Sequence, residues 1–387
     1  MRSEVQIEAK FRELFASSPT MFSSPGRINL IGEHTDYNDG LVLPAAIDKE
    51  MALAISVKKD GPCIVYSYDY EHQISFNLEN FSANSTPWLN YILGVVAQIQ
   101  KKGMSIRPFD CVFGGNIPLG AGLSSSAALE CVFIYALNEL NSLGLDKLEM
   151  VKMAQKAEHE YAGVNCGIMD QFASMFGEKD HVIQLDCRSL EYRSFPFVLD
   201  DYDVVLCDTN VKHSLASSEY NLRRQECERG VAMLQKYQPD IKSLRDVSIE
   251  LLEAHKNEID EVSYRRCRYV IEEIQRVKDS CLMLENGDMD TFGKNMFATH
   301  EGLSKEYEVS CDELDFLVDQ ARNNPDVIGS RMMGGGFGGC TINLVKKTVT
   351  EEFIKKTTQE YSDQFSNDMK SYVVSVEDGT AQKANQL

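Results

Sequence analysis

A short polar stretch near the N-terminus, GRINLIGEHTDYNDG, concentrates side chains that could carry out chemistry. It holds, in order, Arg27, Glu33, His34, Asp36 and Asp39, and short apolar runs flank it. Surface strands alternate apolar and polar residues, and this stretch does not. Its polar groups are of the kind that converge on a small polar molecule, and charged acceptors make the stronger hydrogen bonds to such a ligand. We therefore expect a ligand-binding loop here.

A second stretch, GGNIPLGAGLSSSAALE (residues 114–130), combines a glycine-rich turn, three serines and a helical run. Glycines let backbone amides approach a ligand closely, and a helix N-terminus favours phosphate. Ser124, Ser125 and Ser126 could cap the helix or bind a phosphate or its metal ion. The Walker A pattern is absent, so backbone amides would have to hold a nucleotide without a P-loop lysine. An ordinary strand–turn–helix is an equally good interpretation of this stretch alone.

The sequence RMMGGGFGGCTINLV (residues 331–345) contains a GxGxxG pattern. A dinucleotide-binding fingerprint opens a helix, whereas an apolar, β-branched run follows here, which argues against a nicotinamide dehydrogenase. Five glycines in six positions, 334–339, are more than a hairpin turn needs. They predict a functional loop that is pressed against another loop or a ligand.

A single aspartate, Asp170, lies within the apolar segment GVNCGIMDQF (residues 163–172). Such a residue either caps a turn or is placed for proton chemistry. Taken alone, the pattern favours the cap. A helix is expected over 146–163, and its pattern alone predicts that Glu158 lies on a solvated face of this helix.

Composition limits the classes of function. The 387 residues predict two domains, with 43 % hydrophobic and 25 % charged residues as in soluble globular proteins. We expect a cytoplasmic protein, because neither a membrane-spanning run nor a signal peptide is recognisable. A net charge of −20 disfavours nucleic acid and anionic membranes as partners. The 11 scattered cysteines show neither a disulfide framework nor zinc-site spacing.

The order of expected elements indicates an α+β protein. Helical patterns cover 123–140 and 146–163 and dominate the second half, and strand patterns cover 51–59, 63–69, 109–117, 181–186 and 203–209. Strands and helices do not alternate with the regular rhythm of a doubly wound sheet. We place a domain boundary near residue 200.

Together, and in this order, these stretches resemble the GHMP family of small-molecule kinases, and within it the sugar-kinase branch. GRINLIGEHTDYNDGLVLP resembles the sugar signature of that branch, PLGAGLSSSAALE the phosphate loop, and GGGFGGC the third family motif. CGIMDQF and HSLASSEYNLRRQEC are also similar to segments of the branch. The resemblance covers nearly the whole chain. It implies a ribosomal-protein-S5-like N-terminal domain (1–200), a ferredoxin-like C-terminal domain (201–387) and an active site in the cleft between them.

The resemblance also implies the reaction, which is transfer of the ATP γ-phosphoryl group to the C1 hydroxyl of α-D-galactose with Mg²⁺ as cofactor. The implied sugar ligands are Glu33, His34, Thr35, Asp36, Gly167 and Tyr220. Asp170 would act on the C1 hydroxyl, with Arg27 beside it. The implied ATP ligands are Gly120, Ala121, Gly122, Leu123, Ser124, Ser125 and Ser126 around the triphosphate, with Trp88 at the adenine and Ser67 near the nucleotide. Ser126 and Glu158 would hold Mg²⁺. No protein partner is implied, and His213, Arg223 and Arg224 receive no role.

Two alternatives remain open at this point. A kinase for N-acetylgalactosamine or another pyranose would share the three motifs and differ in the space beside C2. A galactose and ATP sensor without turnover would share the fold, but the presence of Ser126, Ala127, Asp170 and Arg27 argues against it. Within the kinase hypothesis, Asp170 is either a general base or mainly an orienting group for the C1 hydroxyl.

Overall fold

The computed structural model describes residues 4–118, 120–211 and 216–385. The strands are β1 (Thr20–Asn29), β2 (Leu41–Val42), β3 (Pro44–Val57), β4 (Cys63–Ser67), β5 (His72–Phe76), β6 (Phe109–Gly115), β7 (His181–Asp186), β8 (Tyr192–Pro196), β9 (Tyr202–Asp208), β10 (Val327–Met332), β11 (Cys340–Lys346), β12 (Lys370–Val374) and β13 (Ala381–Lys383). The α-helices are α1 (Glu4–Phe15), α2 (Pro87–Lys101), α3 (Ser125–Asn141), α4 (Lys147–Ala157), α5 (Met169–Phe176), α6 (Ala216–Leu234), α7 (Ile249–Ala254), α8 (Glu261–Asn286), α9 (Met289–Lys305), α10 (Asp312–Arg322) and α11 (Thr350–Gln364).

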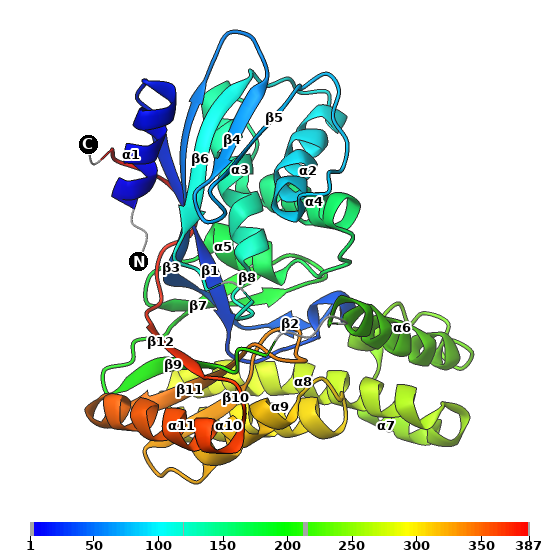
Figure 1. The fold of residues 1–387 in the computed structure, drawn as a ribbon. Helices are drawn as coiled ribbons and strands as arrows, with labels where there is room; N and C mark the ends of the chain where they lie inside the picture. The colour runs from blue at the N-terminus through cyan, green and yellow to red at the C-terminus, as the bar shows by residue number, and fades with distance from the viewer. Residues whose placement is uncertain (1–3, 119, 212–215, 386–387) are drawn as a thin grey trace.

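A six-stranded sheet in the order β13-β1-β3-β6-β4-β5 forms the centre of the N-terminal part. Helices α2 to α5 lie on one face of this sheet, and α1 covers the other face (Figure 1). Strand β3 shows why both faces need cover: Leu53 and Ile55 belong to the main core, whereas Ala52 and Ala54 pack in a smaller cluster with α1. Because successive residues of a strand point to opposite faces, this strand is apolar on both.

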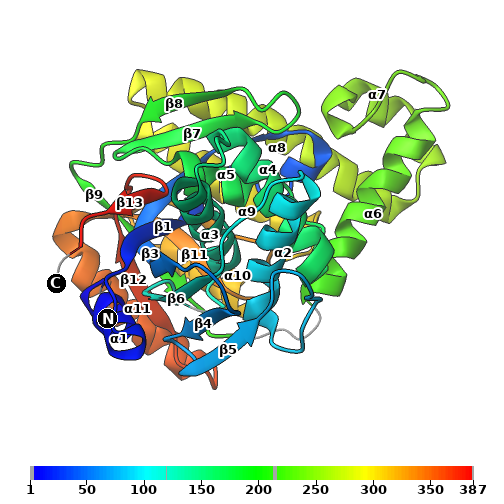
Figure 2. The same cartoon turned by 90° about the horizontal axis from the view of Figure 1, so that it is seen from above.

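The C-terminal part contains a four-stranded antiparallel sheet in the order β12-β9-β11-β10. Its chain order, a strand, a helical segment, two strands, the helix α11 and a last strand, is the split βαβ arrangement of ferredoxin-like domains. The implied α+β fold with a ferredoxin-like C-terminal domain is therefore confirmed. Seen at right angles to the first view, α6 and α7 extend away from the two sheets (Figure 2).

The chain returns to the first sheet at its end, where β13 pairs with β1 and Met21 lies opposite Lys383. The boundary expected near residue 200 falls between β8 and β9. It stays a prediction, because the segment after β12 belongs by its pairing to the N-terminal sheet. A third, three-stranded sheet, β2-β7-β8, lies against α8.

The expected elements agree with the observed ones at most positions. The strand expected over 181–186 is β7, and the glycine cluster leads into β11, as predicted, and not into a helix. The helix expected over 146–163 differs, because α4 ends at Ala157 and a π-helical turn, Glu158–Ala162, follows before Gly163. The cysteines form no disulfide bond. Across 4–118, 120–211 and 216–385, no helix is both long and apolar enough to cross a membrane.

Candidate active site

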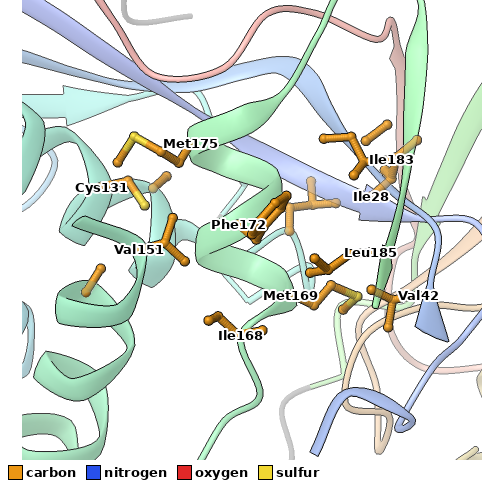
Figure 3. Packing of buried hydrophobic residues seen from close by; sticks show 14 of the residues in the cluster. Ile28, Val42, Cys131, Val151, Ile168, Met169, Phe172, Met175, Ile183 and Leu185 are labelled. Atoms are coloured by element: carbon orange, nitrogen blue, oxygen red, sulfur yellow. The ribbon is translucent and has the colours of Figure 1, made fainter. Parts of the chain in front are cut away.

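Helix α5 holds Asp170 in a fixed position because its other side is deeply buried. Figure 3 shows Phe172 and Met175 of this helix packed among apolar side chains from α3, α4, β1 and β7. Phe172 is 1 % exposed. Asp170 lies in the first turn of the same short helix, and its side chain is 26 % exposed. The helix cap is the backbone of Ile168, so the capping role that the pattern alone favoured for Asp170 is wrong.

Arg27 binds the carboxylate of Asp170 through two parallel hydrogen bonds. Its Nε donates to Oδ1 at 2.8 Å and its Nη2 donates to Oδ2 at 2.9 Å, while Nη1 donates to the carbonyl of Gly122 at 2.6 Å. The Ser124 hydroxyl donates to Oδ2 of the same carboxylate. Such bidentate pairs fix the plane of a carboxylate as well as its charge. One arginine thus connects Asp170, the expected catalytic carboxylate, to the expected phosphate loop.

A cavity of about 150 Å³ opens at this pair. It is lined by Arg27, Glu33, His34, Asp36, Glu158, Val164, Cys166, Gly167, Met169, Asp170, Tyr220, Gly334 and Gly335. The structure thus brings together the sugar ligands, catalytic residues and metal-ligand carboxylate that the sequence suggested, with one exception among the sugar ligands. The Thr35 hydroxyl lies 2.9 Å from the carbonyl oxygen of Gly32 and 2.7 Å from that of Leu41, inside the loop. Thr35 shapes the turn and does not line the cavity.

Gly167 lines the cavity, and this position has no room for a side chain. A β-carbon on this residue would lie 1.8 Å from Oδ2 of Asp36, which is far inside van der Waals contact. The absence of a side chain at Gly167 is therefore what allows the Asp36 carboxylate to lie beside the backbone of the 163–167 loop.

Glu33 has a buried partner that the sequence did not reveal. Its Oε2 accepts a hydrogen bond from Nη2 of Arg331 at 2.7 Å, and the Arg331 side chain is fully buried. The remaining donors of Arg331 bind the carbonyl oxygens of Leu30, Met332 and Asn29. Arg331, which does not itself line the cavity, therefore fixes the orientation of the Glu33 carboxylate. In the sequence, the position of Arg331 directly before the glycine cluster could have indicated this role.

Burial changes the proton affinity of several cavity groups. Loss of solvation, reinforced by the charge of Asp170, raises the pKa of Asp36 and that of Glu158 each to about 7. Burial lowers the pKa of His34 to about 3, so its imidazole is neutral at physiological pH. The cavity thus offers a neutral imidazole and carboxyl groups whose protonation responds to a bound ligand.

The glycine cluster and the phosphate loop are in contact, as the sequence predicted for a loop pressed against another. A β-carbon built on Gly334 would lie 3.4 Å from the carbonyl oxygen of Gly122, and one on Gly339 would lie 3.6 Å from that of Ala121. Gly120 and Gly122 have φ angles of +82° and +74°. Ser124, with φ of +58°, precedes α3 without a side-chain cap, so its hydroxyl is used on Asp170 instead.

The expected metal ligands lie together. The Ser126 hydroxyl, at the start of α3, hydrogen-bonds the carboxylate of Glu158 at the α4–π-turn junction. Glu158 is 7 % exposed, so the solvated-face interpretation is wrong for it, whereas Glu160 pairs with Lys101 at the surface. Gln171, which the sequence analysis missed although it follows Asp170 directly, donates from Nε2 to Glu158 at 2.8 Å.

The two expected nucleotide residues outside the phosphate loop lie near one another but do not line this cavity. Ser67, on β4, has Phe113 of β6 as its register partner, and the Trp88 ring lies 5.3 Å from the Phe113 ring. The Ser67 hydroxyl is buried without a hydrogen-bond partner among the described residues. Both assignments stay predictions.

The residues without an assigned role divide into three cases. Arg223 donates to the carbonyl oxygens of Tyr307 and Glu308, at 2.8 and 2.7 Å, and holds the turn after α9. Arg224 contacts the carbonyl of Asn165 at 3.2 Å. His213 lies outside the described residues.

Comparison with known proteins gives the family. A model described as "Galactokinase galactose-binding signature" matches residues 9–57, and models of the N-terminal and C-terminal GHMP kinase domains match 90–178 and 266–362. The galactokinase of Roseiflexus sp. strain RS-1 is 40 % identical over 97 % of this chain and 96 % of its own length. That of Thermotoga petrophila is 44 % identical over 92 % of this chain and 98 % of its own. The chain belongs to the galactokinase family of GHMP kinases.

A solved structure agrees with this galactokinase-family assignment over the whole fold. The crystal structure of Lactococcus lactis galactokinase in complex with galactose superposes with a TM-score of 0.94 at 36 % sequence identity. It covers 97 % of this chain and 98 % of its own. The family resemblance expected from the motifs is therefore confirmed.

Proposed function

We propose that this galactokinase-family chain transfers the γ-phosphoryl group of ATP to the C1 hydroxyl of α-D-galactose, giving α-D-galactose 1-phosphate and ADP. The observation that carries the proposal is the Arg27–Asp170 pair, which stands in a small polar cavity and is hydrogen-bonded to the phosphate loop. An acceptor hydroxyl bound at Asp170 would lie next to a triphosphate bound at Gly120–Ser126. Phosphoryl transfer depends mostly on such positioning and on charge stabilisation.

The lining of the cavity suits a sugar. A pyranose presents several hydroxyl groups and little apolar surface, so its recognition needs rigid donors and acceptors. Glu33 and Asp36 supply carboxylate oxygens, and Arg331 and Gly167 restrict where these oxygens lie. A site built to pair hydroxyl groups can reject an analogue that leaves its polar groups unpaired by about 10⁴-fold. Glucose, which differs from galactose at one hydroxyl, would be excluded on this basis.

Asp170 is the group that acts on the acceptor. Its Oδ2 accepts from Arg27 and Ser124, whereas Oδ1 accepts from Arg27 alone among the described residues. A carboxylate oxygen has two lone pairs, so Oδ1 keeps one for the C1 hydroxyl. In this proposal Asp170 orients that hydroxyl and takes up its proton as the new O–P bond forms, while Arg27 keeps the carboxylate in place.

Mg²⁺ is the expected cofactor, and the residues present fit it. Ser126 and Glu158 offer two oxygen ligands beside the phosphate loop, and Mg²⁺ usually takes one or two protein ligands together with phosphates and water. Glu158 has no basic partner in the described part of the chain, so its negative charge is uncompensated there. Bound Mg²⁺ would neutralise charge on the transferring phosphates. Gln171 would hold the Glu158 carboxylate in its orientation.

The test is ADP release with Mg-ATP and, in parallel, D-galactose, D-glucose and N-acetylgalactosamine. Turnover confined largely to galactose would support the proposal. Preference for the acetylated sugar would keep the chemistry and change the substrate. Absence of turnover with any of the three, together with measurable binding of galactose and ATP by calorimetry, would favour a sensor instead.

A further inference from the structure

A chain of buried hydrogen bonds leads from the sugar cavity into the C-terminal half. Nδ1 of His34 lies 2.8 Å from the hydroxyl of Tyr37, which lies 2.8 Å from the hydroxyl of Tyr307. That second hydroxyl lies 3.2 Å from Sγ of Cys227 on α6. The reaction proposed above uses none of Tyr37, Tyr307 and Cys227.

The other nitrogen of His34 belongs to the cavity. Nε2 is buried and has no hydrogen-bond partner at normal distance in the described part of the chain, and His34 lines the cavity. The polar group that acts on this ring from the glycine cluster is the carbonyl of Gly335, which partly opposes the lowering of the His34 pKa. A carbonyl oxygen can only accept a hydrogen bond. Among the described residues, Nε2 is thus left for a ligand in the cavity.

The proton count of the chain fixes its direction. Burial holds the pKa of both tyrosine hydroxyls well above 10 and that of the Cys227 thiol at about 12, so all three groups keep their protons. His34 is neutral and carries one proton. A phenolic O–H is a stronger acid than a neutral imidazole N–H, and an imidazole nitrogen accepts a hydrogen bond better than a phenolic oxygen, so in the 2.8 Å contact Tyr37 is the donor and Nδ1 of His34 the acceptor. The thiol then donates to Tyr307, Tyr307 to Tyr37, and Tyr37 to Nδ1 of His34. The opposite direction would leave Nε2 without a proton and without a partner among the described residues.

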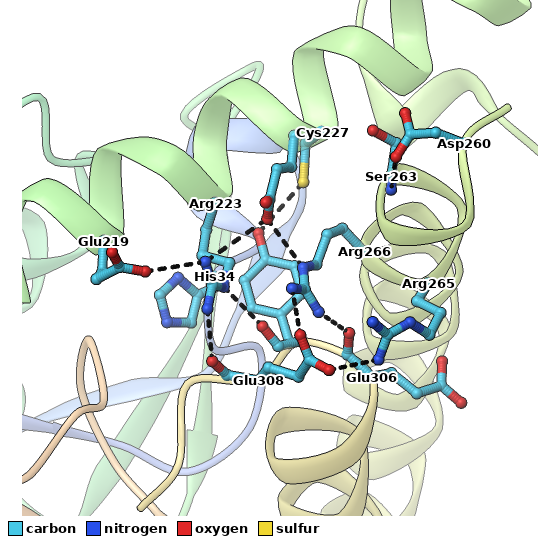
Figure 4. A network of polar contacts seen from close by, with 12 residues as sticks. His34, Glu219, Arg223, Cys227, Asp260, Ser263, Arg265, Arg266, Glu306 and Glu308 are labelled. Atoms are coloured by element: carbon cyan, nitrogen blue, oxygen red, sulfur yellow. Dashed lines mark hydrogen bonds and ion pairs between the residues drawn. The ribbon is translucent and has the colours of Figure 1, made fainter.

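A rigid ionic network holds the inner end of this chain. Figure 4 shows Arg223 of α6 beside His34, and Cys227 of α6 and Arg266 of α8 on the other side of Arg223. Arg223 binds the carbonyl of Tyr307, and Arg266 donates to Oε2 of Glu226 at 2.9 Å and to Oε2 of Glu308 at 2.6 Å. These contacts fix the backbone on both sides of Tyr307. The hydroxyl of Tyr307 therefore has little freedom to move away from Tyr37.

We propose that Tyr37 and Tyr307 are positioning residues that set the tautomer of His34, so that its Nε2–H is a permanent donor to one oxygen of the bound sugar. The identity of the ligand as a sugar rests on the proposed function, whereas the tautomer of His34 is a property of the free protein. A donor of fixed direction selects a hydroxyl oxygen at one place in the cavity. Specificity would thus depend on residues that do not touch the substrate.

The first test observes the tautomer directly. Long-range ¹H–¹⁵N correlation spectra of the uniformly ¹⁵N-labelled, ligand-free protein distinguish a protonated from an unprotonated ring nitrogen for each of its seven histidines. The His34 signals are those that disappear in His34→Gln. We expect a protonated Nε2 and a bare Nδ1 in the wild-type protein, and a mixture of tautomers in Tyr37→Phe. A wild-type His34 protonated at Nδ1 would overturn the proposal whatever the protein phosphorylates.

The second test measures binding. Tyr37→Phe keeps the ring and removes the hydroxyl, and we expect a two- to tenfold (roughly one hydrogen bond) rise in the galactose KM with an unchanged ATP KM. His34→Gln should retain more galactose affinity than His34→Asn, because the glutamine amide reaches the position of Nε2. Asparagine tolerates the φ of +63° at this position better, so a folding effect would favour the opposite order.

Tyr361→Phe is the matched control. It removes another buried hydroxyl, which donates to the carbonyl of Thr209 at 2.8 Å, away from this chain. We expect it to leave the His34 signals and both KM values unchanged. An unchanged His34 tautomer together with an unchanged galactose KM in Tyr37→Phe would refute the role of Tyr37. Absence of sugar turnover in every variant and in the wild type would refute the proposed function and leave the spectroscopic test standing.

Discussion

Nε and Nη2 of Arg27 donate to the two carboxylate oxygens of Asp170 at 2.8 and 2.9 Å, and the third guanidinium nitrogen reaches the carbonyl of Gly122 in the phosphate loop. The carboxylate therefore has a fixed plane before any substrate arrives. Preorganised charge of this kind costs no rearrangement during the reaction. The pair couples the acceptor side of the cavity to the side where phosphate is expected.

Replacing Asp170 by asparagine tests whether the carboxylate moves a proton. Asp170→Asn keeps the shape of the side chain and cannot act as a base, so we expect kcat to fall at least ~100-fold, the usual contribution of a general base. Steady-state kinetics with galactose and ATP, alongside circular dichroism, measure this change. Asp110→Asn on β6, which disrupts an ion pair with Lys58, is the control and should leave kcat unaltered. A near-normal kcat in Asp170→Asn would limit Asp170 to an orienting role.

Replacing Glu33 should affect the fold as well as the sugar. Removing one partner of a buried ion pair costs about 3–5 kcal/mol, and the carbonyl oxygens that remain around Arg331 reduce this cost. We expect Glu33→Ala to raise the galactose KM and to lower the free energy of unfolding by at least about 2 kcal/mol. Glu33→Gln, which keeps an acceptor for Arg331, should lose less stability.

Urea unfolding and the galactose KM measured on the same preparations check this pair of variants. Glu285→Ala provides the control, because its ion pair with Arg193 is solvent-exposed and worth no more than about 1 kcal/mol. If Glu33→Ala unfolded at the wild-type urea concentration, the Glu33–Arg331 pair would have no structural role. A fall in kcat with an unaltered KM would contradict the assignment of Glu33 to binding.

The sequence predicted the parts of the site that lie within a motif. Glu33, His34 and Asp36 could be identified because their residue types and close spacing have few other uses. The residues it missed act across long sequence separations, as Arg331 does on Glu33 and Tyr307 does on Tyr37. Those contacts depend on how the C-terminal half folds back, and no local pattern contains that information.

Local backbone geometry explains the two remaining differences. Thr35 stands between two cavity residues, but the tight turn after it directs its hydroxyl to the carbonyls of Gly32 and Leu41. Helical periodicity placed Glu158 and Glu160 on one continuous helix. Residues two apart in a helix point roughly 200° apart, so Glu158, where the π-helical turn begins, is buried while Glu160 is at the surface.

Adding a methyl group at Gly167 tests how closely the two halves of the sugar cavity must approach. Because a β-carbon there would overlap the Asp36 carboxylate, Gly167→Ala must displace Asp36 or the 163–167 loop. We expect a galactose KM at least ~10-fold higher, since about 1.4 kcal/mol of lost binding corresponds to that factor. Gly163→Ala is the control, because it adds backbone strain at a φ of +75° but meets no atom within 4 Å. Equal KM values for the two variants would show that loop strain, and not the contact with Asp36, determines sugar binding.

The raised pKa of Asp36 predicts how stability depends on pH. The folded protein holds the Asp36 proton up to a pKa of about 7, whereas an unfolded chain releases it near the ordinary aspartate pKa of 3.8. Between these values the folded state binds more protons than the unfolded state, so the contribution of Asp36 to the free energy of unfolding falls as pH rises. Asp36→Asn has no such proton. We therefore expect the wild type to lose stability relative to Asp36→Asn between about pH 4.5 and pH 7, with no further change above that range, in urea unfolding curves. A stability difference that stayed constant across this range would mean that Asp36 is already ionised in the folded protein, and that Arg27 and the polar backbone around it compensate for its burial.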